Sequence, residues 1–251
     1  MPKRIMPVLF IVLIASQVCA QEKVRLTNGE WPPYLSRDLK AYGLASRIVT
    51  EAFARVGLEV QYGFFPWARA YEIAKTGEWD GSVVWSYSDE RTKSFYFSAP
   101  IVFRKMVFFH MKDFAFDWNE MKDLKGIPIG ATLKYHYGKA FEVAEKSGLI
   151  TVIRIPYDEL NLKKLYHGRI KLFVGDELVT PTMINKHFTL EQRSRFTHHP
   201  KAVDVGGYHL ILSKAIPKNK KLIVRFNKGL EQLQASGLLD KYRNEIVKAV
   251  P

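Results

Sequence analysis

Residues 79–91 read WDGSVVWSYSDER, and FYFSAP follows over residues 95–100. A turn at Asp80-Gly81 enters a short apolar run, which predicts a buried strand. The run ends in hydroxyl residues and in Arg91. An arginine just beyond a strand end is well placed to bind an anion in a cleft, because its planar guanidinium can donate two parallel hydrogen bonds to a carboxylate. This stretch therefore predicts a buried strand that carries an anion-binding arginine at its end.

The first twenty residues are typical of a secretory signal peptide. Residues 3–4 are basic, residues 8–15 are apolar, and small side chains at 18–20 precede an expected cleavage at Gln21. The apolar stretch is too short to span a bilayer comfortably, although a retained N-terminal anchor is the alternative. We expect Cys19 to leave with the signal, so the mature chain has no cysteine and no disulfide.

Composition narrows the class of protein. The mature chain of roughly 230 residues is long enough for one large or two smaller α/β domains, and a 47% hydrophobic content supports a substantial core. The net charge is +13, from 38 basic and 25 acidic residues, and removing Lys3 and Arg4 leaves +11. The basic residues are scattered, with their longest cluster at 218–221, so we expect no nucleic-acid partner. A basic surface of this kind aids solubility and attracts small anions.

Two runs of alternating strand and helix patterns follow. A β-α-β-α-β order predicts a parallel sheet with right-handed crossovers. The first run has strands over 23–27, 59–64 and 83–85, with helices over 45–56 and 66–77, and Pro66 is the expected first residue of the second helix. The second run has strands over 127–130, 151–155 and 170–174, with helices over 137–147 and 159–167. A strand over 208–213 and helices over 177–186, 220–236 and 239–247 remain.

The order and spacing of several motifs resemble the bacterial extracellular solute-binding proteins of family 3, the polar-amino-acid receptors of ABC importers. The motifs are residues 80–91 with the downstream FSAP, GRIKLFVGD over 168–176, and the tail over 226–242, and the resemblance spans residues 22–247. It implies an α/β, type II-like periplasmic-binding-protein fold, in which two lobes with mostly parallel sheets are joined by a two-segment hinge. We expect lobe 1 to comprise 21–107 and 208–251 and lobe 2 to comprise 108–207, with crossings at 106–111 and 205–209.

The resemblance also implies a ligand site. Arg91 matches the arginine that holds an amino acid's α-carboxylate, with Ser86 and Ser88 able to share that group. Asp176 matches the aspartate that receives the α-ammonium group, although a helix N-cap is an alternative role for it. Arg91 and Asp176 would then face each other from opposite lobes. One ligand could bridge them only in the closed form, so binding would shift the open–closed population.

Aromatic residues are expected around this site. Trp31 matches the aromatic residue of the family's first loop, and Trp67 and Trp85 could also line the cleft, although core packing is the alternative for each tryptophan. Tyr135 lies where amino-acid receptors carry a Gly-Thr pair and could donate one hydrogen bond. Its neighbour Lys134 either adds a second cation near Arg91 or points to water. This departure leaves room for a more anionic ligand.

The leading hypothesis is a monomeric periplasmic receptor that delivers an amino acid or related zwitterion to an inner-membrane ABC permease. We expect neither cofactor nor metal, and we expect His198 and His199 to be surface residues. The first alternative is a dehydratase-like enzyme on the same fold, for which Glu30 and Glu90 are the candidate acids. The second alternative is a ligand-sensing partner of a membrane sensor protein.

Overall fold

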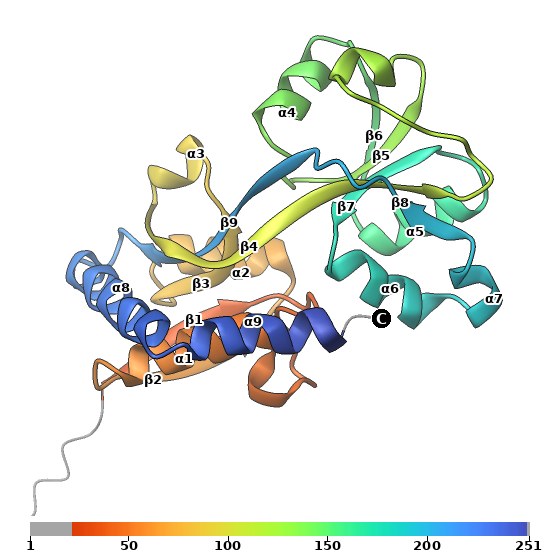
Figure 1. Ribbon diagram of the computed structural model, residues 1–251. Helices are drawn as coiled ribbons and strands as arrows, with labels where there is room; N and C mark the ends of the chain where they lie inside the picture. The colour runs from red at the N-terminus through yellow and green to blue at the C-terminus, as the bar shows by residue number, and fades with distance from the viewer. Residues whose placement is uncertain (1–21, 250–251) are drawn as a thin grey trace, which may run out of the picture.

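The computed structural model describes residues 22–249 as two lobes that share one mixed nine-stranded sheet (Figure 1). The expected signal peptide, including Cys19, lies outside the described residues. The strand order is β2-β1-β3-β9-β4-β7-β5-β6, and β8 pairs with β4. The strands are β1 (Lys23–Asn28), β2 (Glu59–Phe64), β3 (Gly81–Ser86), β4 (Phe95–Met111), β5 (Pro128–Thr132), β6 (Thr151–Ile155), β7 (Leu172–Asp176), β8 (Phe196–His198) and β9 (Asp204–Ser213).

Each lobe contains the parallel unit that the sequence predicts. In the first lobe β1 pairs in parallel with β2 and β3, and in the second lobe β5 pairs in parallel with β6 and β7. The helices are α1 (Leu44–Ala54), α2 (Trp67–Lys75), α3 (Asp89–Thr92), α4 (Lys139–Lys146), α5 (Asp158–Tyr166), α6 (Val179–His187), α7 (Leu190–Arg193), α8 (Asn219–Ala235) and α9 (Leu238–Ala249), with 3-10 turns η1 (Lys40–Tyr42) and η2 (Met121–Leu124).

Two long strands connect the lobes. Figure 1 shows β4 and β9 running side by side from one lobe into the other, and they pair antiparallel from Phe95↔Ser213 to Met106↔Asp204. Beyond this ribbon, β4 continues into the second lobe and pairs with β7 and β8. The crossings predicted at 106–111 and 205–209 fall on these two strands, but residues 107–111 already pair with strands of the second lobe, so β4 crosses earlier than predicted. Pro100 and Arg104 interrupt the apolar pattern of β4, so its 17-residue length was not predicted.

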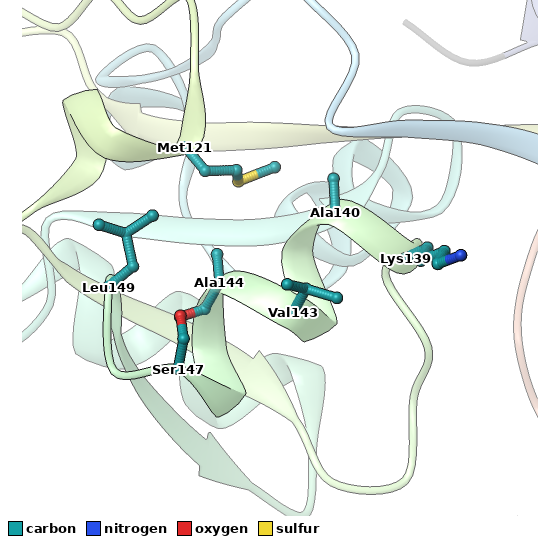
Figure 2. Close-up of a pocket in the computed structure, with 7 residues that line it drawn as sticks. All are labelled: Met121, Lys139, Ala140, Val143, Ala144, Ser147 and Leu149. Atoms are coloured by element: carbon teal, nitrogen blue, oxygen red, sulfur yellow. The ribbon is translucent and has the colours of Figure 1, made fainter.

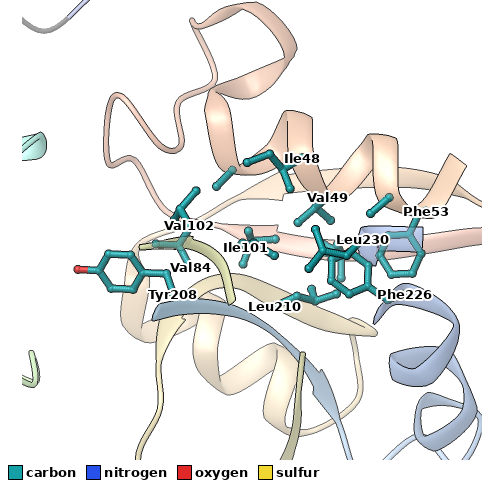
Figure 3. Close-up of a cluster of buried hydrophobic side chains, with 14 of the residues drawn as sticks. Ile48, Val49, Phe53, Val84, Ile101, Val102, Tyr208, Leu210, Phe226 and Leu230 are labelled. Atoms are coloured by element: carbon teal, nitrogen blue, oxygen red, sulfur yellow. The ribbon is translucent and has the colours of Figure 1, made fainter. Parts of the chain in front are cut away.

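The core of the first lobe lies between the sheet and the pair α1 and α8 (Figure 3). Phe53 of α1 and Phe226 of α8 pack with ring centroids 4.8 Å apart. The two helices approach closely at Gly229, where a Cβ atom would lie 2.0 Å from the carbonyl oxygen of Ala52. In the second lobe, neighbouring residues of β4 serve opposite faces: Phe108 packs on the side of α4, and Phe109 on the side of α5 and α6.

Helix boundaries differ from the sequence prediction by one or two residues. Pro66 has φ −52° and ψ 138°, so it is the N-cap of α2 and not its first helical residue. The predicted helix over 137–147 begins only at Lys139, because Gly138 has φ 96° and ψ 153°, which is not helical. Among the described residues, no helix is both long and apolar enough to cross a membrane.

Candidate ligand-binding site

Arg91 lies at the end of β3, on the short helix α3. Its Nη1 donates to the carbonyl oxygen and to the hydroxyl oxygen of Ser86, both at 2.8 Å. The guanidinium also stacks over the Trp85 ring, 5.1 Å from its centroid. Ser88 is the N-cap of α3, and its hydroxyl accepts from the backbone N–H of Arg91 at 3.4 Å. Ser86 therefore holds the charged end of Arg91, and Ser88 holds the helix that carries it.

A backbone irregularity turns this strand end. Val84 has φ 66°, a left-handed conformation that is unusual for a β-branched residue, and the β3–β9 register shifts between Ser82 and Trp85. Such bulges often re-aim side chains next to binding sites. The Trp85 indole N–H then donates back to the Ser82 hydroxyl at 2.7 Å, which fixes the ring under Arg91.

The three predicted tryptophans form one connected series. Trp85 contacts Trp67 edge-on at 5.4 Å, and Trp67 contacts Trp31 edge-on at 6.4 Å. Trp31, in the loop after β1, then contacts Tyr135 of the second lobe at 6.2 Å. Trp67 and Trp85 are half-buried and Trp31 is buried. The series therefore joins Arg91 to the opposite lobe through aromatic side chains.

Asp176 is the last residue of β7 and is 3% exposed. One carboxylate oxygen, Oδ1, accepts from the backbone N–H groups of Leu178 and Val179 at 2.9 and 3.1 Å. The other oxygen, Oδ2, is buried without a hydrogen-bond partner among the described residues. The N-cap role and the ligand role are thus compatible, because they use different oxygens. Burial raises the pKa of Asp176 from 3.8 to about 6.

Arg104 of β4 was not predicted as a site residue, but its charge acts on both Arg91 and Asp176. Its guanidinium lies 5.6 Å from the ring centroid of Tyr208 and pairs with Asp204. Burial is the main cause that lowers the pKa of Arg91, and the positive charge of Arg104 lowers it further. The charge of Arg104 also opposes the rise in the pKa of Asp176. A cation that interrupts an apolar strand pattern was the signal available in the sequence.

Two further aromatic residues complete the contact between the lobes. Tyr208 of β9 contacts Trp31 at 5.2 Å and Tyr34 at 5.9 Å. Burial, and then the charge of Asp176, raises the pKa of both tyrosines well above the ordinary value, so both hydroxyls are protonated. The region between Arg91 and Asp176 is therefore lined by aromatic rings with neutral hydroxyl groups.

A second carboxyl group reaches this region from the start of α5. The Asp158 carboxylate accepts from the Thr132 hydroxyl, and burial raises its pKa from 3.8 to about 6. The Trp31 side chain opposes this rise in the pKa of Asp158, and its indole N–H is buried without a hydrogen-bond partner among the described residues. Asp158 and Trp31 thus approach each other across the two lobes.

The remaining candidates lie elsewhere or point away. Lys134 is exposed, with φ 65°, so its side chain points to solvent. His199 contacts Asp117 at 2.9 Å, and no group of three potential metal ligands occurs among residues 22–249. Glu30 is exposed and accepts from the backbone of Arg37. The pKa of Glu90 is lowered because Lys93 donates to it, which is the opposite of what a general acid requires.

A surface hollow on the second lobe is a separate feature (Figure 2). It is lined mostly by small and apolar residues of α4, with Met121 and Leu149, and Lys139 is its single charged lining residue. A small polar ligand needs convergent polar groups to fix its orientation. The hollow offers only Lys139 and Ser147 as polar side chains, so it does not match such a site.

Comparisons with known proteins agree with this architecture. The sequence model of the bacterial extracellular solute-binding proteins, family 3, matches residues 24–248. No curated protein sequence resembles the chain closely enough to count as a match.

Three solved structures show the same fold at low sequence identity. A histidine kinase sensor domain with similarity to periplasmic binding proteins has a TM-score of 0.74 at 18% identity, covering 90% of this chain and 96% of that one. A mutant of ArgBP from T. maritima has a TM-score of 0.72 at 19% identity, with coverages of 90% and 95%. The ancestral amino acid-binding protein AncCDT-1, a precursor of cyclohexadienyl dehydratase, has a TM-score of 0.67 at 16% identity, with coverages of 89% and 94%. The family match over nearly the whole described chain shows that this protein belongs to the bacterial extracellular solute-binding proteins of family 3.

Proposed function

We propose that this protein is a periplasmic receptor that captures an amino acid or a related small zwitterion between its lobes and delivers it to an ABC permease. The observation that carries the proposal is the buried Oδ2 atom of Asp176, which has no hydrogen-bond partner among the described residues. A buried charged group without a partner is costly. A ligand ammonium group that donates to Oδ2 would remove that cost.

The ligand's carboxylate would bind Arg91 at the other end of the cleft. Ser86 occupies only Nη1 of the guanidinium, so its other donors remain for a ligand. Each charge-assisted hydrogen bond contributes about 1.5–3 kcal/mol net. Because the two anchors lie on different lobes, both bonds form only when the lobes are closed. This difference in binding free energy would shift the population toward the closed form.

The site is prepared before the ligand arrives. The Leu178 and Val179 N–H groups fix the orientation of Asp176, and Ser86 with Trp85 fixes Arg91. Trp31 and Tyr135 would form an aromatic wall against the ligand's apolar part. Such pre-organisation reduces the conformational entropy that is lost on binding.

The cellular context follows from the same proposal. We propose export by cleavage of the predicted signal peptide, action as a monomer, and division into lobes at 21–107 with 208–251 and at 108–207. The antiparallel ribbon of β4 and β9 would then be the hinge, since it is the pair of segments that joins the lobes.

A thermal-shift screen of the mature protein tests the proposal. The compounds would be single amino acids, polyamines and organic acids, because a ligand that binds only the folded state raises the melting temperature. Asp176→Asn and Arg91→Gln should abolish the shift while leaving a folded protein. Asp113→Asn and Arg225→Gln are matched controls on exposed residues and should respond like the parent. A full response in both site variants would disprove the site.

Asp158 gives the enzymatic alternative a specific form. Its raised pKa, about 6, suits a general acid better than that of Glu90. If the protein were a dehydratase, a bound hydroxy acid would lose water during incubation, and Asp158→Asn would stop the loss. Recovery of unchanged ligand after long incubation with the parent protein would exclude this alternative for the compounds tested.

A further inference from the structure

We propose that Arg104 is a ligand-binding residue and that the cleft takes an amino acid with two anionic groups, a dicarboxylic amino acid. The inference rests on the proposed function and adds a third anchor to it. Arg91 would hold the α-carboxylate, Asp176 the α-ammonium group, and Arg104 the second carboxylate.

Arg104 points toward the buried face of the β4–β9 ribbon. Alternate residues of a strand lie on opposite faces. Phe103 and Val205 are 62% and 68% exposed, so their face of the ribbon is open to solvent. Arg104 lies on the other face, where it is 8% exposed and contacts Tyr208, one of the residues that join the lobes. Arg104 is therefore at the floor of the cleft.

The Arg104 guanidinium is only partly hydrogen-bonded among the described residues. Its Nη2 pairs with Asp204, whereas Nε and Nη1 are buried and have no hydrogen-bond partner among the described residues. Buried polar groups in native proteins are nearly always hydrogen-bonded, and an orphaned donor calls for an explanation. A ligand carboxylate at the floor of the cleft would accept from these donors.

Arg104 is also a near neighbour of Asp176 in the sheet. Asp176 pairs with Met106 across β7 and β4, so Arg104 is its diagonal neighbour, two residues along β4 on the same face. Such diagonal positions lie about 7–8 Å apart. Among the described residues, no hydrogen bond or ion pair joins Arg104 to Asp176, and each keeps buried polar atoms without a partner. A small zwitterion can fill the space between them and pair with both.

The remaining charges near the floor leave the two arginines available. Asp204 engages only Nη2 of Arg104. Burial lowers the pKa of His136, as do the charges of Arg104 and Arg91, so this side chain is neutral at pH 7.5. Two other acids approach this region: Glu177 pairs with Lys105, and the Asp158 carboxylate accepts from the Thr132 hydroxyl. Two cationic anchors and one anionic anchor are complementary to one ammonium and two carboxylates.

Calorimetric titration with isosteric ligand pairs tests the inference. The probes are L-glutamate against L-glutamine and L-aspartate against L-asparagine, which differ only in whether the side chain ends in a carboxylate or an amide. We expect the parent protein to bind at least one acid about 10- to 100-fold more tightly than its amide, the range of a charge-assisted contact. Arg104→Gln should reduce this preference below about threefold while changing the affinity for the amide little.

Arg104→Lys is the second variant, because lysine can still pair with Asp204 but lacks the Nε and Nη1 donors. It should also narrow the preference, and Arg225→Gln, an exposed control, should leave it unchanged. Equal loss of affinity for acid and amide would mean that Arg104 supports the hinge and does not contact ligand, and would overturn the inference. Tighter binding of L-lysine or L-arginine than of either acid would also overturn it, leaving the proposed function intact. Binding of neither an amino acid nor a related small zwitterion would instead refute the proposed function.

Discussion

Replacing Asp176 by asparagine should have opposite effects on stability and on binding. Asparagine keeps an oxygen that accepts from Leu178 and Val179, but it removes the buried charge at the unpartnered oxygen. The pKa of Asp176 is raised from 3.8 to about 6. Each pKa unit corresponds to about 1.4 kcal/mol, so ionisation of this carboxyl costs the folded state about 3 kcal/mol at pH 7.5.

The sign of the pH dependence follows from the raised pKa. The folded state binds the Asp176 proton more tightly than the unfolded state does. The parent therefore compares best with the variant below pH 3.8, and its unfolding free energy falls relative to that of the variant as the pH rises from 3.8 through 6. At pH 7.5 and without ligand, we expect Asp176→Asn to be more stable than the parent by about 1–3 kcal/mol, or about 2–4 °C in melting temperature per kcal/mol. At pH 4 the difference should shrink toward zero.

Denaturant unfolding at pH 7.5 and pH 4 measures these differences, and thermal shift with amino acids measures binding. The variant should gain stability at pH 7.5 and lose its response to ligand. Asp113→Asn, whose carboxylate is exposed, should show neither effect. An Asp176→Asn protein that is less stable at pH 7.5 and still responds to ligand would refute the reasoning.

Three further outcomes follow from the structure. Ligand affinity should fall about tenfold per pH unit below pH 6, because the ligand's ammonium group pairs only with ionised Asp176. Calorimetric titrations at pH 5, 6 and 7.5 measure this fall, and an affinity that does not change with pH would contradict it. Gly229→Ala should cost about 1–3 kcal/mol of unfolding free energy, because its Cβ would lie 2.0 Å from the Ala52 carbonyl oxygen; an unchanged denaturation midpoint would show that α1 and α8 can separate freely. Gly138→Ala should cost a similar amount, because its Cβ would lie 2.3 Å from Asp204 Oδ1 at φ 96°; a melting temperature equal to the parent's would rule out that strain.

Much of the fold can be predicted from local patterns. The strands at 59–64 and 151–155 have the predicted bounds, because alternating side chains and flanking turns define them locally. The length of β4 could not be predicted, since Pro100 and Arg104 read as interruptions. Both are accommodated by tertiary context: the β4–β9 register shifts around Pro100, and Arg104 is buried against Tyr208 and paired with Asp204.

The site shows the same division. Arg91 and Ser86 were singled out from a motif within one segment, as groups that share a ligand carboxylate. The bond from Arg91 to Ser86 became visible only in the structure, which also places Trp31, Trp67, Trp85 and Tyr135 in one connected series. The sequence does not predict three residues near the site, because their position depends on how distant strands pair. They are Tyr208, Arg104 and Asp158. Asp176 was predicted as a site residue from its motif. Only the side-chain positions in the structure show that its two oxygens differ, one capping the helix and the other unpartnered among the described residues.

The most direct test of the central claim is a crystal structure of the mature protein with the amino acid that gives the largest thermal shift. The account predicts that the ligand lies between the lobes, with its ammonium within hydrogen-bond distance of Asp176 Oδ2 and its α-carboxylate on the Arg91 guanidinium. A ligand bound in the surface hollow lined by α4, or one held by a single lobe without contact to Asp176, would contradict it.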